Sequence, residues 1–231
     1  MIFSRKRAGE ARHARDERST EVLDTEETGG STEAQARGPY DISEAPDEPR
    51  LDLGSLQIPA VPEVEVRVQA DPQGVIQQVV LVHGESALQL GVFAAPRSEG
   101  IWAEVREEIR QSLFNDGAAA QEIDGEYGPE LRARVRTPDG LTDLRFVGID
   151  GPRWMVRGVY QGGAATDPAV AGPLARCLSG LVVDRGQEAK PVREPLPLRL
   201  PREVAEQQAA EQQAAEQQAA EQQLAPGQRE A

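Results

Sequence analysis

Three strand-like segments follow one another closely in the second half of the chain, and they constrain the fold more than any other feature. They are ELRARVR (130–136), LTDLRFVGI (141–149) and RWMVRGVY (153–160), and only short loops containing TPDG and DGP join them. Connections this short are typical of β-hairpins. The sequence therefore predicts three antiparallel neighbours in one sheet.

Earlier segments extend this sheet. PEVEVRVQA (62–70) alternates valines with charged residues, as a half-buried strand does, and DPQG after it supplies a turn. VIQQVVLVH and SALQLGVFA follow as two further strands. A weaker strand is expected near 119–123, and LVVDR is expected to form a short last strand that ends near Gly186.

Two helices are expected among these strands. GIWAEVREEIRQSLFNDG (100–117) spaces apolar residues four apart, with acids on the other side and turn-forming residues at its end. TDPAVAGPLARCLSG (166–180) starts with capping residues and a proline in the first turn. We therefore predict an α+β fold: a mostly antiparallel sheet of about six to seven strands, with two helices that cover one face.

Both ends of the chain have compositions that disfavour a packed core. Residues 1–51 hold few large apolar side chains and change from basic to acidic, so we expect a disordered, charged N-terminal tail. Residues 187–231 join a proline-rich stretch to a five-residue EQQAA repeat, which scatters its alanines around a helix. We expect a Pro-rich spacer and a disordered or partly helical repeat tail there. One α+β domain at 52–186 then lies between two disordered tails.

Two stretches carry a resemblance to a known family. APRSEGIW (95–102) and GPRWMVRG (151–158) resemble an actinobacterial domain-of-unknown-function family, DUF3710, over roughly residues 50–186, and the charged start MIFSRKR is similar too. This resemblance implies no activity, cofactor or catalytic residue. The order of elements is also similar to that of the Mog1/PsbP-like α/β/α sandwiches, most of which are binding or assembly modules.

The composition argues against several classes of protein. A formal net charge of −14 disfavours attraction to nucleic acid by the chain as a whole. The charged N-terminus lacks the apolar run of a secretory signal, and no apolar run reaches the roughly 20 residues of a membrane span. Cys177 is the single cysteine, so no disulfide framework forms. We expect a cytoplasmic protein that neither binds nucleic acid nor inserts into a membrane.

Few residues suit catalysis or metal binding. His83 and Cys177 cannot form a zinc site between them; we expect a structural histidine and a cysteine in the core. YQGGAATDPAV could cradle an anion, but Asp167 stands where a phosphate would bind and no phosphate-loop lysine is present. No serine has a GxSxG context. We therefore expect no catalytic residues, no metal and no cofactor.

The two hairpins predict which side chains share a face of the sheet. Closing TPDG as a tight turn places Leu131 opposite Phe146 on an apolar face. Closing DGP in the same way places Trp154 opposite Gly148, so that Trp154 joins the core on that face. The other face then carries a row of arginines, formed by Arg132, Arg145 and Arg157 with Arg134 and Arg153 nearby.

This arginine row is the one binding surface that the sequence indicates. Like charges directly opposite one another destabilise a sheet by up to about 1 kcal/mol per pair, so acidic groups should face them. Solvent and acids elsewhere in the domain can balance these charges. Alternatively the row docks an acidic segment, either residues 21–48 of this chain or a protein partner, or it belongs to a small enzyme or nucleotide-binding protein.

We expect a binding or adaptor module without catalytic machinery. The arrangement around the arginines distinguishes a binding module from a small enzyme. A pocket lined by close carboxylates would favour the enzyme, because paired acids perform acid and base chemistry. An open, flat surface would favour the module.

Overall fold

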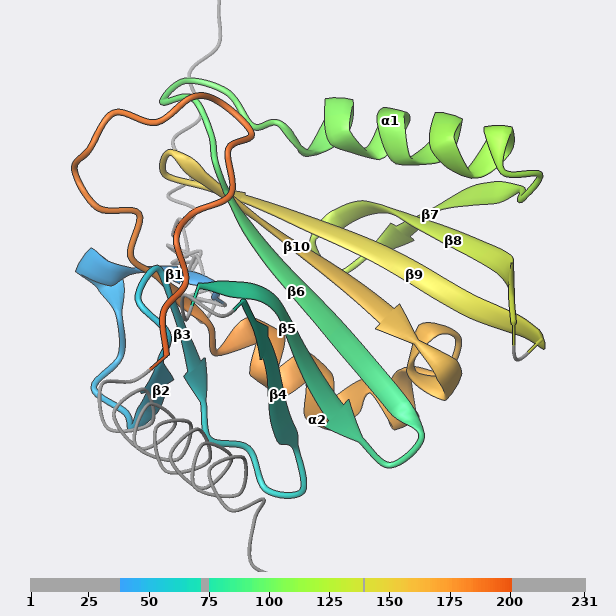
Figure 1. Ribbon diagram of the computed structural model, residues 1–231, viewed down its shortest axis with the longest axis horizontal. Coiled ribbons are helices and arrows are strands. Elements are labelled where there is room, and N and C mark those ends of the chain that lie inside the picture. Colours follow the sequence, from blue (N-terminus) through green and yellow to red (C-terminus); the bar gives the residue numbers. More distant parts are fainter. Residues whose placement is uncertain (1–37, 72–74, 139, 201–231) are drawn as a thin grey trace, which may run out of the picture. The chain divides into compact units, whose positions relative to one another are not determined.

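A seven-stranded antiparallel sheet forms the centre of the computed structural model, which describes residues 38–71, 75–138 and 140–200 (Figure 1). Consecutive strands are neighbours within each half of the sheet, and the pairing of β6 with β10 joins the two halves. The spatial order is β4 (Glu65–Ala70), β5 (Ile76–His83), β6 (Ser86–Ala94), β10 (Trp154–Gln161), β9 (Gly140–Gly151), β8 (Gly128–Thr137) and β7 (Ala120–Gly125).

The two helices, α1 (Trp102–Asn115) and α2 (Pro168–Ser179), lie on opposite faces of this sheet (Figure 1). A Cβ atom on Gly148 would lie 2.0 Å from the Trp102 ring of α1, whereas one on Gly158 would meet Leu178 of α2. Gly148 pairs with the neighbour of Gly158, so the two glycines face opposite sides. The α+β class is confirmed, but the expectation that both helices cover one face was wrong.

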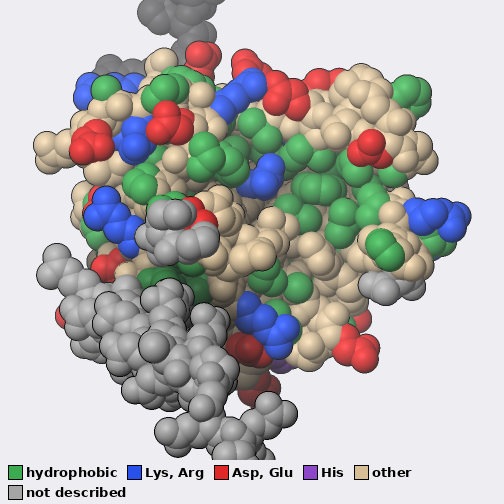
Figure 2. Space-filling model, viewed as in Figure 1, with side chains coloured by type: hydrophobic (Ala, Val, Ile, Leu, Met, Phe, Trp, Pro, Cys, Tyr) green, Lys and Arg blue, Asp and Glu red, His purple; other side chains and the backbone are tan. Residues whose placement is uncertain are grey.

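We name the two sides of the sheet the α1 face and the α2 face. Figure 2 shows the α1 face, where hydrophobic side chains gather over the middle of the surface with Lys or Arg side chains among them. Within the described residues, neither helix is long and apolar enough to cross a membrane.

A second, four-stranded sheet adds to the core on the α2 face. Its order is β1 (Tyr40–Asp41), β11 (Val182–Val183), β3 (Leu56–Pro59) and β2 (Arg50–Asp52), with the short 3-10 helix η1 (Ile42–Glu44) beside β1. A second 3-10 helix, η2 (Gly162–Ala165), follows β10 and contacts the main sheet and α2. Leu56, Ile58 and Val183 pack in one hydrophobic cluster with α2 and the main sheet. The indole of Trp154 donates a hydrogen bond to Asp41. Residues 38–51 therefore belong to the domain, which begins before the predicted residue 52.

The proline-rich segment after Gly186 also belongs to the domain. The Leu196 amide bonds to the Val92 carbonyl and the Ile76 amide to the Leu198 carbonyl, and both leucine side chains are buried in the core. In an extended chain alternate residues face one side, so the leucines point inward and the prolines outward. We name residues 187–200 the strap. The spacer prediction was wrong here, while the remaining parts of the predicted tails 1–51 and 187–231, residues 1–37 and 201–231, lie outside the described residues.

The register of the sheet agrees with the prediction at one hairpin and differs at the next. Leu131 pairs with Phe146 as predicted. Trp154 pairs with Gly151 rather than Gly148, because the β9–β10 turn contains only Pro152 and Arg153. A shift of three residues is odd, so every β10 side chain moves to the other face of the sheet. Trp154 is buried as predicted, but it lies on the α2 face.

The strap generates a prediction for stability. Replacing Leu196, which is 3% exposed, by alanine should lower the free energy of unfolding by about 2 to 5 kcal/mol, as Leu→Ala changes in cores do. Val192 lies in the same strap but is 50% exposed, so Val192→Ala should change it by less than about 0.5 kcal/mol. Urea unfolding of the full chain measures both. Equal losses in the two variants would show that Leu196 is not held against the core.

Candidate functional site

The five arginines of the predicted row do not share one face. Arg132 and Arg145 pair directly on the α2 face, as predicted. Arg157 pairs with Gly148 and therefore lies on the α1 face, and Arg153 occupies the β9–β10 turn with a φ of 65°. The arginine row is thus corrected: the odd shift in the register of β10 separates Arg157 from the others.

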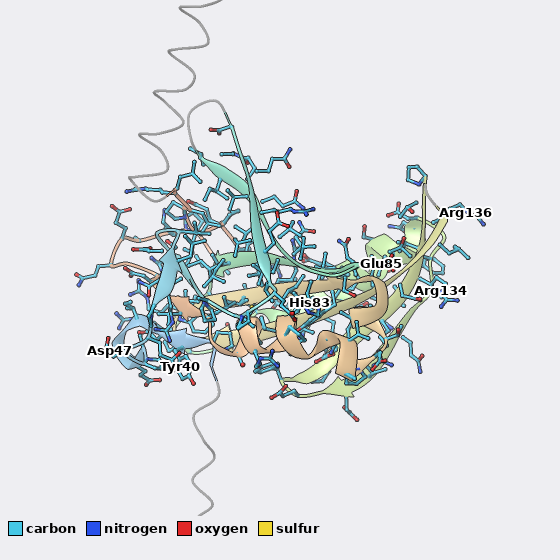
Figure 3. All side chains as sticks on the ribbon, turned by 90° about the horizontal axis from the view of Figure 1, so that it is seen from below. Tyr40, Asp47, His83, Glu85, Arg134 and Arg136 are labelled. Carbon is cyan, nitrogen blue, oxygen red and sulfur yellow. The ribbon has the colours of Figure 1, made fainter. Side chains whose placement is uncertain are left out.

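Arg134 lies on the same face as Arg132 but is already paired. Its Nε and Nη2 donate to Asp143 at 2.7 and 2.9 Å, in an exposed, bidentate ion pair. Figure 3 shows Arg134 and Arg136 at the outer end of the sheet, with Tyr40 and Asp47 at the opposite end. The described part of the acidic segment, residues 38–48, therefore lies away from these arginines.

Arg132 and Arg145 lie at the floor of a cleft of about 330 Å³ on the α2 face. Helix α2 packs over β5 and β6, and the small side chains of Ala171 and Ala175 leave space between the helix and the β7–β8 hairpin. We name this space the α2 cleft. Its floor is formed by Glu130, Arg132, Arg145, Val147 and Tyr160.

Glu130, Arg145 and Tyr160 form a buried cluster in the cleft. The Glu130 side chain is 3% exposed, and its Oε2 lies 3.3 Å from Arg145 Nη1. The Arg145 guanidinium stacks 4.1 Å above the Tyr160 ring, and its Nη2 donates to the Ala164 carbonyl. Burial raises the pKa of the Glu130 carboxyl above its usual range, although Arg145 beside it acts in the opposite direction. The cluster therefore holds a proton-sensitive carboxyl beside a fixed cation.

The β7–β8 hairpin makes room for this carboxyl. Its turn is Glu126 and Tyr127, between Gly125 and Gly128. A Cβ atom on Gly125 would lie 1.9 Å from Glu130 Oε1, so only glycine lets the carboxyl lie against the turn. Glu130 was not among the site residues predicted from sequence. The signal was present: Glu130 precedes Arg132 by two residues, so the two share a face of β8.

Several donors in the cleft have no partner among the described residues. The Nε atoms of Arg132 and Arg145 are buried without a hydrogen bond, and Arg132 forms no ion pair with a described side chain. Burial raises the pKa of Tyr160, so its hydroxyl keeps its proton and remains a donor. Buried polar groups are normally hydrogen-bonded. The cleft therefore presents donors that suit an acceptor from outside the domain.

The remaining candidates for chemistry lie outside the cleft. Cys177 is fully buried in the core, as predicted, and burial raises the pKa of its thiol to about 11. His83 ends β5, with its Nε2 3.9 Å from the Glu63 carboxylate. The Asp167 carboxylate caps α2 by accepting from the Ala169 amide. In the described ranges, no three His, Cys, Asp or Glu side chains come together in a group that could hold a metal ion.

Comparison with known proteins places the chain in a family. No curated protein and no solved structure matches it. One family model, described as a protein of unknown function, matches residues 38–207. The match covers most of the chain and includes both segments that extend the domain beyond its predicted limits, residues 38–51 and the strap. The chain belongs to the DUF3710 family.

Proposed function

We propose that the domain is a binding module that holds a small organic anion in the α2 cleft. Arg132 carries this proposal, because its guanidinium lines the cleft with a buried Nε and no partner among the described residues. Ligand pockets have volumes of about 300 to 1,000 Å³. The cleft, at about 330 Å³, suits a molecule the size of a small metabolite.

The charges on the floor support an anion with a second polar group. Glu130 forms an ion pair with Arg145, whereas Arg132 forms no ion pair with a described side chain, although Asp124 and Glu126 also line the cleft. A guanidinium binds a carboxylate or phosphate through its planar fork of donors. The Tyr160 hydroxyl can donate to the same ligand, and Glu130 can accept from a hydroxyl or ammonium group on it. These groups together favour a hydroxy acid or an amino acid.

This proposal replaces the docking of an acidic protein segment on an arginine row. A row needs neighbouring guanidinium groups on one open face, whereas here Arg157 lies on the other face and Arg134 is bound to Asp143. A cytoplasmic location remains part of the proposal. It is supported by the single cysteine, Cys177, which cannot form a disulfide within the chain.

A small enzyme that uses the same cleft is the second candidate. The raised pKa of Glu130, beside Arg145 and Tyr160, favours it, because a buried carboxyl of this kind serves as a general acid or base. Glu130 would then remove a proton from a bound acid. Replacement of the Cα hydrogen of L-malate by deuterium in D2O, and its loss in Glu130→Gln, would support the enzyme over the module.

The binding proposal predicts a dependence on Arg132. L-malate and succinate differ only by a hydroxyl group, and both should shift amide resonances of the cleft in the isotope-labelled full chain, with L-malate binding more tightly. Arg132→Gln should weaken both by about tenfold or more, since hydrogen bonds to charged groups contribute about 1.5 to 3 kcal/mol. Arg134→Gln, on the same face but outside the cleft, should leave both affinities unchanged. Equal weakening by the two variants would contradict the proposal.

The raised pKa of Glu130 predicts a pH dependence of stability. The folded chain binds this proton more tightly than the unfolded chain. The contribution of Glu130 to the free energy of unfolding is therefore fully present below the ordinary carboxyl pKa of about 4.5. It is lost as pH rises through the raised pKa of the folded chain. The free energy of unfolding of the wild type, relative to Glu130→Gln, should fall over that range in a pH series of urea unfolding.

A second carboxyl supplies a control of opposite sign. Hydrogen bonds from Arg134 lower the pKa of Asp143, so its contribution is present above the ordinary pKa and is lost as pH falls through the lowered one. The stability of the wild type relative to Asp143→Asn should therefore rise with pH. If both comparisons changed with pH in the same direction, the pKa of Glu130 would not be raised by burial.

A further inference from the structure

The α1 face of the main sheet is covered by a described helix at one end only. Helix α1 packs on β7, β8 and β9, and its start shares a small hydrophobic cluster with Phe93 of β6. No described helix covers β5 and the rest of β6 on this face (Figure 1). One row of residues paired across the middle of this face is largely apolar: Val80, Gln89, Val159 and Phe146. An antiparallel sheet that faces water usually carries polar side chains on that side. Figure 2 shows hydrophobic side chains gathered there.

The next row contains one cation between two glycines. Arg157 on β10 pairs with Gly91 on one side and Gly148 on the other. Its Nη2 lies 3.9 Å from where a Cβ of Gly91 would be, and its guanidinium carbon is 5.2 Å from the centre of the Phe93 ring. The Trp102 ring occupies the space beside Gly148. The guanidinium therefore lies low on the sheet, against the ring of Phe93.

Arg157 has no acid to balance it within the described residues. It forms no hydrogen bond or ion pair there, and its Nε is buried without a partner. Burial lowers the pKa of Arg157, because the charged form is less favourable away from water. Two acids on the same face are already engaged: Glu65 pairs with Arg67, and Asp150 accepts from the first amides of α1. An arginine does not relieve this cost by losing its proton.

We propose that this surface docks a segment of a partner protein that carries a carboxylate between apolar side chains. We name the surface the central patch and define it by the half-buried residues Val80, Phe93, Phe146 and Arg157, with Val159 between them buried at 7% exposure. The carboxylate would bind the terminal nitrogens of Arg157, and its apolar neighbours would cover the valines and phenylalanines.

A second copy of the chain fits this surface poorly. In a two-fold dimer the same patch faces itself. Two Arg157 side chains would then approach each other, while the carboxylates of Glu65 and Asp150 stay engaged within their own chains. The central patch is also separate from the α2 cleft, because the two lie on opposite faces of the sheet.

A matched pair of peptides tests the proposal. Acetyl-Leu-Val-Asp-Val-Leu-amide and the same peptide with Asn in place of Asp are titrated into the isotope-labelled full chain. The Asp peptide should shift the amides of Gly91, Gly148 and Arg157 and bind about tenfold more tightly than the Asn peptide, a difference of about 1.4 kcal/mol. Arg157→Gln should make the two affinities equal. Arg67→Gln, which removes the paired arginine of the same face, should leave the tenfold preference unchanged.

Several outcomes would overturn the proposal. Equal affinity of the two peptides for the wild type, or shifts confined to the α2 cleft, would do so. Shifts at the patch that depend on protein concentration without peptide would identify a second copy instead. If Arg157→Gln does not fold, pH tests the same contact in the wild type, because the peptide carboxylate loses its charge below its ordinary pKa of about 3.9. An Asp preference that persists when the peptide carboxyl is protonated would then reject the ion pair.

Discussion

The two-residue turn at Pro152 and Arg153 fixes the register of β10 and therefore the face of the sheet on which each β10 side chain lies. The rest of the structure depends on that register. β10 pairs with β6 on one side and β9 on the other, so its side chains decide what each face of the sheet contains. One residue more or fewer in the turn would exchange Trp154 and Tyr160 with Met155 and Arg157. An unpaired guanidinium would then lie under α2. Arg153 adopts a φ of 65°, which is unfavourable for a residue with a side chain, so the flanking pairs must hold the turn in place.

The two helices are attached to the two faces of the sheet by different kinds of contact. Helix α1 is fixed to the sheet by polar contacts at its first turn: the Asp150 carboxylate accepts from the amides of Ile101 and Trp102, and the Trp102 indole donates to the Pro129 carbonyl. Helix α2 is held by apolar packing, with Leu174 and Leu178 buried against the main sheet. Each helix covers a different part of the sheet. The α2 cleft lies beside one helix, and the central patch lies beside the other.

Much of the fold could be predicted from sequence, because it depends on local patterns. The alternation in β4 and β8, the two helices and the register of the β8–β9 hairpin all follow from the spacing of apolar residues and one turn. The β9–β10 register could not, because Asp150 and Gly151 look like turn residues yet continue β9 as paired strand. The packing of the strap on the core could not be predicted from sequence for a similar reason. Proline content indicates an extended chain, but only long-range contacts show that Leu196 and Leu198 are buried.

The candidate site was predictable in part. Arg132 and Arg145 were placed side by side correctly, since one hairpin register determines their pairing. Glu130 could not be recognised as buried, because its burial depends on the β7–β8 turn and on where α2 packs. Arg157 was assigned to the wrong face through the same register error that moved Trp154. The misplacements of Arg157 and Trp154 therefore have one origin, the length of a single turn.

The strap has a consequence for the order in which the domain assembles. It joins the ends of β5 and β6, and through ion pairs from Arg193 to Glu104 and Glu108 it also holds α1. These contacts span about a hundred residues of chain, so they raise the contact order, as the pairings of β6 with β10 and of β11 with β1 and β3 also do. Because synthesis proceeds from the N-terminus, the strap leaves the ribosome after every strand that it covers. The hairpins can pair during translation, but the core closes only when residues 196–198 have arrived.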